Sequence, residues 1–175
     1  VFGTGVSCMP NHSPFVLAHR IAQLDQMAQG RFMWGVGAGS FIGDMEMVGI
    51  DRRSGYQRQL TGDAIDLVLK LWDGWEDGAA VLARDTGQWA DLARLHPPEH
   101  HGRYFDVAGY LPFPRSPQGH PLLTQAGTSA AGKALAARYA DAVFTPLAAI
   151  PAGVASRDDL RAQAAACGRE PGHIR

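Results

Sequence analysis

The residues best suited to chemistry form the string GTSAAGKA at positions 127–134, directly after a short apolar segment and at the start of a helical pattern. The unpaired N–H groups and the dipole of a helix N-terminus favour an anion. The hydroxyls of Thr128 and Ser129 add further donors. The string therefore predicts a phosphate-binding loop at Gly127, Thr128 and Ser129. The alternative is a plain Ser/Thr cap on a structural helix.

The same string nearly matches GxxxxGK followed by Ser or Thr, the loop of nucleotide hydrolases. Ala134 stands where a hydroxyl is needed for magnesium. Asp141 precedes its apolar segment instead of ending it, so no acidic strand end supports hydrolysis. We expect phosphate binding without nucleotide hydrolysis.

Glycines at positions 35, 37 and 39 alternate at the end of an apolar segment. A dinucleotide-binding fingerprint needs a helix directly afterwards, whereas residues 40–44 have the composition of a loop. The pattern favours a strand end where a flat ligand ring approaches the backbone, because glycine has no Cβ in the way.

A group of histidines and one glutamate at residues 96–101 raises the possibility of a metal site. Pro97 and Pro98 prevent helical pairing of these side chains, and their spacing fits no zinc pattern. We expect a solvated loop and no metal.

The bulk composition is that of one globular domain of 175 residues, with 46% hydrophobic and 19% charged residues and a net charge of -1. This argues against disorder and against nucleic acid or an anionic membrane as partner. No apolar run approaches the roughly 20 residues that span a bilayer. Cys8 and Cys167 form no ligand motif, which favours a reduced, cytoplasmic setting and leaves a single disulfide open.

Strand and helix patterns alternate along the chain. Strands are expected at residues 1–8, 32–36, 121–125 and 142–145, and helices at 14–28, 56–72, 129–139 and 157–167. Ser13 and Pro14 suit the first helix start, Gly30 suits the position after its end, and Ser156 is the expected cap of the last helix. The alternation predicts a parallel α/β fold, either a barrel or a doubly wound sheet. In both folds, ligands bind at the carboxyl ends of the strands.

Residues 75–119 interrupt this alternation. They are rich in Pro, His, Gly and Trp and lack sustained helical periodicity. We interpret them as a long insertion, of the kind that often forms a lid or a binding loop. A hairpin is expected between residues 104–107 and 110–113.

Several strings together resemble the luciferase-like, flavin-dependent monooxygenases. GTGVSCMP at 3–10, LDQM at 24–27 with GRF at 30–32, and WGVGAG at 34–39 through VGID at 48–51 resemble the third and fourth strands of that family. LWDGWEDG at 71–78, GRYFDV at 102–107, PRSPQG at 114–119, QAGTS at 125–129 and ADAVF at 140–144 resemble its nitrilotriacetate, dibenzothiophene-sulfone and long-chain alkane branch. The resemblance covers nearly the whole chain and implies a (β/α)₈ TIM barrel, of which this chain is an internal piece with about strands three to six.

The resemblance implies a role for each matching residue. Gly127, Thr128 and Ser129 hold the FMN phosphate in such proteins, and Arg58 matches an arginine that pairs with it. Gly5, Ser7 and Gly37 lie against the isoalloxazine ring. The chain departs from each branch of the family at one place. Ala38 stands where the luciferase branch has a second phosphate-pairing arginine, and Ser54 and Arg58 stand where the nitrilotriacetate branch has His and Tyr. The family's usual catalytic histidine lies upstream of Val1, so no catalytic residue is assigned.

The function implied is oxygenation of a small organic substrate with O₂ and reduced FMN, which a separate NAD(P)H:flavin reductase supplies. The parent is expected to be a homo-oligomer, and the isolated piece to be inactive. An F420-dependent dehydrogenase of the same superfamily and a non-catalytic flavin-binding barrel fragment stay open as alternatives. Neither the substrate nor the reductase follows from the sequence.

Overall fold

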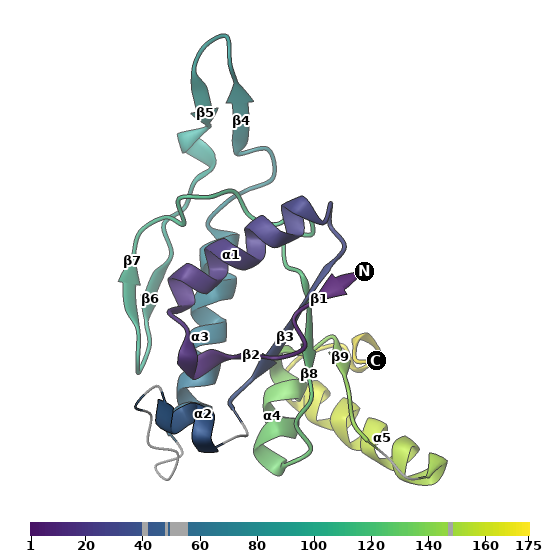
Figure 1. The fold of residues 1–175 in the computed structure, drawn as a ribbon. Helices are drawn as coiled ribbons and strands as arrows, with labels where there is room; N and C mark the ends of the chain where they lie inside the picture. The colour runs from purple at the N-terminus through teal and green to yellow at the C-terminus, as the bar shows by residue number, and fades with distance from the viewer. Residues whose placement is uncertain (40–41, 48, 50–55, 147–148) are drawn as a thin grey trace.

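The computed structural model describes residues 1–39, 42–47, 49, 56–146 and 149–175. Its main sheet consists of β1 (Phe2–Gly3), β2 (Ser7–Cys8), β3 (Phe32–Gly37), β8 (Leu122–Gln125) and β9 (Ala142–Val143). The order is β1-β3-β8-β9, β2 also pairs with β3, and every pair is parallel (Figure 1). The predicted parallel α/β architecture is confirmed.

The helices between these strands are α1 (Pro14–Met27), α2 (Ile42–Met47), α3 (Tyr56–Asp73), α4 (Ala130–Tyr139) and α5 (Ile150–Ala166). Short 3₁₀ turns occupy Met9–Asn11, Leu92–Arg94 and Pro171–His173. No helix among the described residues is both long enough and apolar enough to cross a membrane.

One face of the sheet is buried against the helices. Trp34 of β3 meets Trp72 of α3 edge to face, with ring centroids 5.5 Å apart, and Trp72 donates its indole N–H to the carbonyl of Ala18 in α1. Because side chains alternate along a strand, the other face carries different residues. There Leu122 is 49% exposed, and Phe144, directly after β9, is 72% exposed.

The predicted helix limits hold where the terminal residues have a clear physical role. Gly30 follows α1 with φ +73°, a conformation that favours glycine. Ser129 caps α4, and its Oγ accepts a hydrogen bond from the Gly132 amide. Ser13 precedes α1 as predicted, although its side chain makes no cap hydrogen bond.

Several predicted boundaries were wrong. The last helix begins at Ile150, so Ser156 lies inside it: Pro151 suits the first turn, and the helix starts without a side-chain cap. Residues 1–8 form two short strands instead of one, β9 ends at Val143, and the expected loop at 40–44 includes the start of α2.

The insertion contains two hairpins, neither at the predicted position. β4 (Ala80–Ala83) pairs with β5 (Gln88–Ala90), and β6 (Glu99–His101) pairs with β7 (Asp106–Ala108). The predicted turn near residue 109 is displaced because the chain reverses at residues 102–105, where tertiary contacts with α3 hold it. At the base of the insertion, the Trp75 indole donates to the Leu111 carbonyl at 2.8 Å.

Candidate functional site

The carboxyl ends of the parallel strands lie along one edge of the sheet. Cys8 is in register with Gly37, Val36 with Gln125, and Gln125 with Val143. The chain leaving each of these strands therefore emerges at the same edge (Figure 1). This brings Ser7, Gly37 and the loop at 127–129 to one side of the molecule, while Gly5 lies in the β1–β2 connection beside Gly35.

The loop at 127–129 leads directly into α4. The Ser129 side chain accepts from the Gly132 amide at 3.1 Å, which is the cap expected of a structural helix. The Thr128 side chain is exposed and has no hydrogen-bond partner among the described residues. The amides of Ala130 and Ala131, in the first turn, have no intrahelical acceptor. The loop thus offers a hydroxyl and two amides to an anion, in addition to its capping role.

The loop is tight because two glycines touch. A Cβ on Gly127 lies 2.3 Å from Nε2 of Gln125 and 3.0 Å from Cα of Gly132, and a Cβ on Gly132 lies 2.9 Å from Cα of Gly127. These distances leave no room for a side chain at either position. The glycines at 127 and 132 therefore allow the loop to fold back against the start of α4.

Lys133 does not face an anion site at this loop. Its ammonium pairs with Asp159 of α5, with Nζ 2.6 Å from Oδ2. Asp141 accepts the Leu123 amide at 2.8 Å and so holds the start of β8. Both side chains therefore have structural partners within the fold.

The glycine pattern at 35–39 has a different explanation from the one predicted. A Cβ on Gly35 meets the carbonyl oxygen of Gly5 at 2.3 Å, and one on Gly37 meets Cγ1 of Val6 at 2.6 Å. The chain itself occupies the space above these two glycines. Gly5, in contrast, has nothing within 4 Å of an added Cβ, so open space adjoins it.

A network of hydroxyl groups fixes the β1–β2 connection on β3. The Thr4 hydroxyl donates to the carbonyl of Gly35 at 3.2 Å and accepts from the Gly35 amide at 2.9 Å. The buried Ser7 hydroxyl donates to Oγ1 of Thr4 at 3.3 Å. The Ser7 side chain thus supports the strand end, and this network sets the position of Gly5.

Gln125 is a residue of this edge to which the sequence reasoning gave no role. It is 6% exposed, its side chain lies beneath Gly127, and its buried Oε1 has no hydrogen-bond partner in the part of the chain that the structure describes. The available signal was an amide side chain at the end of β8, directly before the glycine loop. Arg58 falls in the first turn of α3, and its side chain, like Ser54, lies outside the described residues.

A groove of about 470 Å³ lies between the N-terminal half of α3 and the length of α4. Gln59 and Gly62 line one wall, Ala131 and Ala134 the other, and Arg103 and Tyr104 of the β6–β7 turn close one side. Because Ala131 belongs to the first turn of α4, the groove begins beside the loop at 127–129.

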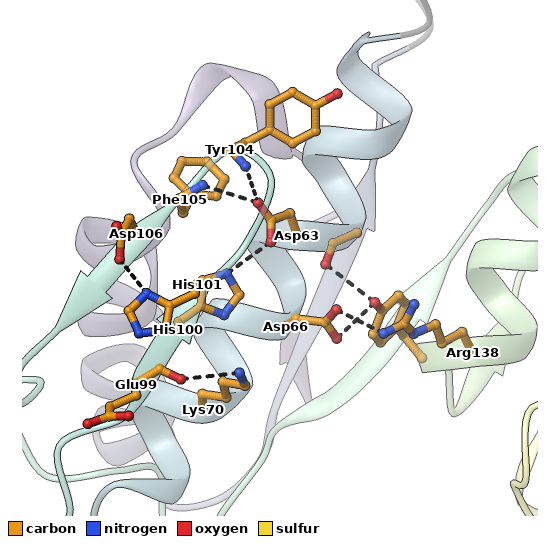
Figure 2. Close-up of polar contacts among 12 residues, drawn as sticks. Asp63, Asp66, Lys70, Glu99, His100, His101, Tyr104, Phe105, Asp106 and Arg138 are labelled. Atoms are coloured by element: carbon orange, nitrogen blue, oxygen red, sulfur yellow. Dashed lines mark hydrogen bonds and ion pairs between the residues drawn. The ribbon is translucent and has the colours of Figure 1, made fainter.

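Asp63 of α3 holds the β6–β7 turn in place, as Figure 2 shows. Its carboxylate accepts the amides of Tyr104 and Phe105 at 2.6 and 3.1 Å and contacts Nε2 of His100 at 2.9 Å. The side chain of His100 is 4% exposed. The prediction that residues 96–101 form a solvated loop was therefore wrong for His100, because Asp63 gives it a buried partner. No set of three or more potential ligands in the described part of the chain can hold a metal.

At the other end of the groove, the Tyr139 hydroxyl donates to Asp66 at 2.9 Å, and Arg138 pairs with the same carboxylate (Figure 2). Burial, together with the hydrogen bond to Asp66, raises the pKa of Tyr139 well above its usual range. The phenol therefore stays protonated and acts as a donor that ties α4 to α3.

Comparison with known proteins extends these observations. The family model described as luciferase-like monooxygenase matches residues 1–175. N-acetyl-S-(2-succino)cysteine monooxygenase of Bacillus subtilis is 35% identical over 92% of this chain and 37% of its own length. Nitrilotriacetate monooxygenase component A of Aminobacter aminovorans is 34% identical over 94% of this chain and 37% of its own length. This chain thus spans little more than a third of these relatives.

The fold matches solved structures as well. A riboflavin lyase determined with a modified FMN and riboflavin superposes with a TM-score of 0.88 and 31% identity. The match covers 97% of this chain and 38% of the lyase. The chain belongs to the family of luciferase-like monooxygenases, and its parallel sheet is part of their (β/α)₈ barrel.

Proposed function

We propose that the protein carrying this chain is a flavin-dependent monooxygenase that uses reduced FMN and O₂ to oxygenate a small organic substrate. Membership of the luciferase-like family supports the reaction class. The observation that carries the cofactor assignment is the free donor set at the carboxyl edge, namely the exposed Thr128 hydroxyl and the first-turn amides of α4. The 175 residues hold part of this site.

The residues present fit a flavin mononucleotide. The loop at Gly127, Thr128 and Ser129 supplies uncharged donors for a phosphate at a helix N-terminus, and the space beside Gly5 leaves room for a planar ring next to the backbone. Arg58, in the first turn of α3, is the proposed cationic partner of the phosphate. When bound, reduced FMN supplies the electrons that activate O₂.

The chain's own contribution is to bind and orient the flavin. The Thr128 hydroxyl and the two first-turn amides fix both the position and the direction of a phosphate, and the contact between Gly127 and Gly132 holds the loop against the start of α4. Ser7 and Thr4 hold the β1–β2 connection, so Gly5 keeps its place at the ring. Gly37 lies at the end of the neighbouring strand, but Val6 occupies the space where its Cβ would lie, so the proposed wall rests on Gly5.

The decisive experiment compares FMN with riboflavin, which lacks the phosphate. In the complete protein, Thr128→Val removes a hydroxyl while keeping the side-chain shape. A hydrogen bond to a charged group contributes about 1.5–3 kcal/mol, which predicts a loss of FMNH₂ affinity of roughly 10- to 150-fold. Anaerobic titration of riboflavin should be unaffected by the same substitution. An equal loss for both ligands, or no loss for FMNH₂, contradicts the assigned phosphate position.

The remaining functional assignments rest on relatives. The name of the nitrilotriacetate relative, component A, indicates an oxygenase that works with a second component, and a separate NAD(P)H:flavin reductase is the proposed electron source here. Titration with F420 tests the dehydrogenase alternative: tighter binding of F420 than of FMNH₂ moves the assignment to hydride transfer. Binding of none of these cofactors leaves the non-catalytic alternative.

A further inference from the structure

The loop before α4 presents only uncharged donors to a phosphate. These donors are the Thr128 hydroxyl and the first-turn amides, and Lys133, which follows in the sequence, is already paired with Asp159 of α5. A phosphate monoester carries a charge of about −1.5 to −2 near neutral pH. Arg58, the cationic partner proposed above, balances no more than one unit of this charge. A second cation beside the loop would complete the balance.

The groove between α3 and α4 contains such a cation. Among the described residues, two carboxylates and two arginines line it. Asp63 accepts the two amides of the β6–β7 turn, and Asp66 pairs with Arg138. Arg103 is exposed and has no ion-pair partner in the described part of the chain. It is therefore the arginine of this groove that can pair with an added anion.

The β6–β7 turn fixes the place of Arg103 and leaves its charge available. Asp63 accepts the amides of Tyr104 and Phe105, the next two residues, and a Cβ on Gly102, the residue before, lies 1.9 Å from its Oδ1. The turn thus packs directly on this carboxylate. The guanidinium carbon of Arg103 lies 5.5 Å from the centroid of the Tyr104 ring. Such a contact orients a guanidinium without using its N–H donors.

Arg103 and the loop at 127–129 adjoin the same groove. Arg103 belongs to one side of its lining and Ala131, in the first turn of α4, to another. The walls between them include Gly62 and Ala134, whose small side chains leave the path open. Figure 1 shows the β6–β7 turn toward the end of the molecule at which α4 begins, whereas the β4–β5 hairpin projects from the opposite end. The turn therefore brings a cation to the carboxyl edge of the sheet.

We propose that Arg103 binds the flavin phosphate from the groove, across from the loop at 127–129. This inference rests on the proposed function, because it takes the phosphate to lie at that loop. It gives the β6–β7 hairpin of the insertion a role in cofactor binding, which is to deliver a positive charge. Asp63 is then a positioning residue, since it acts on the phosphate only through the turn that carries Arg103.

Anaerobic titration of the complete protein with FMNH₂ and with riboflavin tests this. Arg103→Met removes the charge and should lower FMNH₂ affinity about tenfold, whereas riboflavin, which has no phosphate, should bind as before. Arg103→Lys keeps the charge but loses the two-pronged geometry, so its loss should be smaller, about threefold. Added salt should weaken FMNH₂ binding more in the wild type than in Arg103→Met. Arg84→Met, at an exposed arginine of the β4–β5 hairpin, is the matched control and should change neither affinity.

Asp63→Ala tests the positioning role, because it frees the turn and leaves the arginine in place. It should weaken FMNH₂ binding by a factor similar to Arg103→Met, and the double variant should lose no more than Arg103→Met alone. Losses that multiply overturn the positioning role. If Thr128→Val weakens FMNH₂ binding and Arg103→Met does not, the phosphate loop stands and the proposal for Arg103 is overturned. An equal loss of riboflavin affinity in Arg103→Met also overturns it, because the arginine then supports the fold and not the phosphate.

Discussion

Replacing Gly127 by alanine places a methyl group where the loop before α4 has no room. The added Cβ lies 2.3 Å from Nε2 of Gln125 and 3.0 Å from Cα of Gly132. Gln125 is buried, so its side chain has little space to withdraw, and Gly132 is held by the cap hydrogen bond to Ser129. Backbone strain plays no part, because Gly127 is not among the residues with positive φ. The effect is therefore steric.

Overpacking a tight site costs about 1–3 kcal/mol. In a domain of this size, each kcal/mol shifts the melting temperature by about 2–4 °C, so Gly127→Ala should lower Tm by roughly 2–12 °C. The substitution also moves the Thr128 hydroxyl, and if this loop holds the phosphate, FMNH₂ affinity should fall more than riboflavin affinity.

The matched control is Gly62→Ala in the middle of α3. A Cβ there meets the Tyr139 hydroxyl at 3.8 Å, an ordinary van der Waals distance. Alanine is favoured over glycine inside a helix by about 0.5–1 kcal/mol, so this variant should melt slightly higher than wild type. Thermal unfolding and anaerobic titration of both variants check the reasoning. A Gly127→Ala protein as stable as wild type, with unchanged preference for FMNH₂, refutes the steric account and the loop assignment together.

Three further substitutions test polar contacts that hold the fold together. Asp25→Ala leaves the buried donors of Asp25 unsatisfied and should cost about 3 kcal/mol or more, measurable by chemical denaturation. Asp63→Ala should speed hydrogen exchange at the two β6–β7 turn amides that it accepts, while exchange in β3 stays slow. Lys133→Met should raise the pKa of Asp159, which hydrogen bonds from Lys133 and Gln163 now lower. A carboxyl group whose pKa is lower in the folded than in the unfolded protein stabilises the fold at pH values above its unfolded-state pKa, and this stability is lost as the pH falls. Because Lys133→Met removes part of that difference, the free energy of unfolding should fall less on acidification in the variant than in the wild type. Chemical denaturation at several pH values checks this.

Much of the sheet and its helices could be predicted from sequence because the determinants are local. Leu60, Ala64, Leu67 and Leu71 recur at helical spacing in α3 and are all buried. Ser129 stands before an alanine-rich segment and caps α4 as expected. In both helices, local propensity and the periodicity of burial agree, so tertiary contacts had nothing to override.

The insertion could not be predicted in the same way, because its structure depends on contacts distant in sequence. His100 is buried where its ring nitrogen Nε2 contacts Asp63 of α3, and the same carboxylate accepts the amides of the following turn. Nothing near His100 in the sequence reveals that partner. The position of the β6–β7 hairpin follows from the same carboxylate, so both errors have one cause.

Glycine clusters show most clearly what sequence alone leaves open. The clusters at 35–39 and 127–132 both indicate that something approaches the backbone closely, and in both the sequence favoured a ligand. In the cluster at 35–39, Gly5 and Val6 occupy the space beside the glycines. In the cluster at 127–132, Gly127 and Gly132 contact each other. The space beside Gly5, together with the Thr128 hydroxyl, which has no partner among the described residues, is what remains for a ligand. A glycine therefore marks a close approach but not its partner, and the candidate site rests on the donors that the protein itself leaves unused.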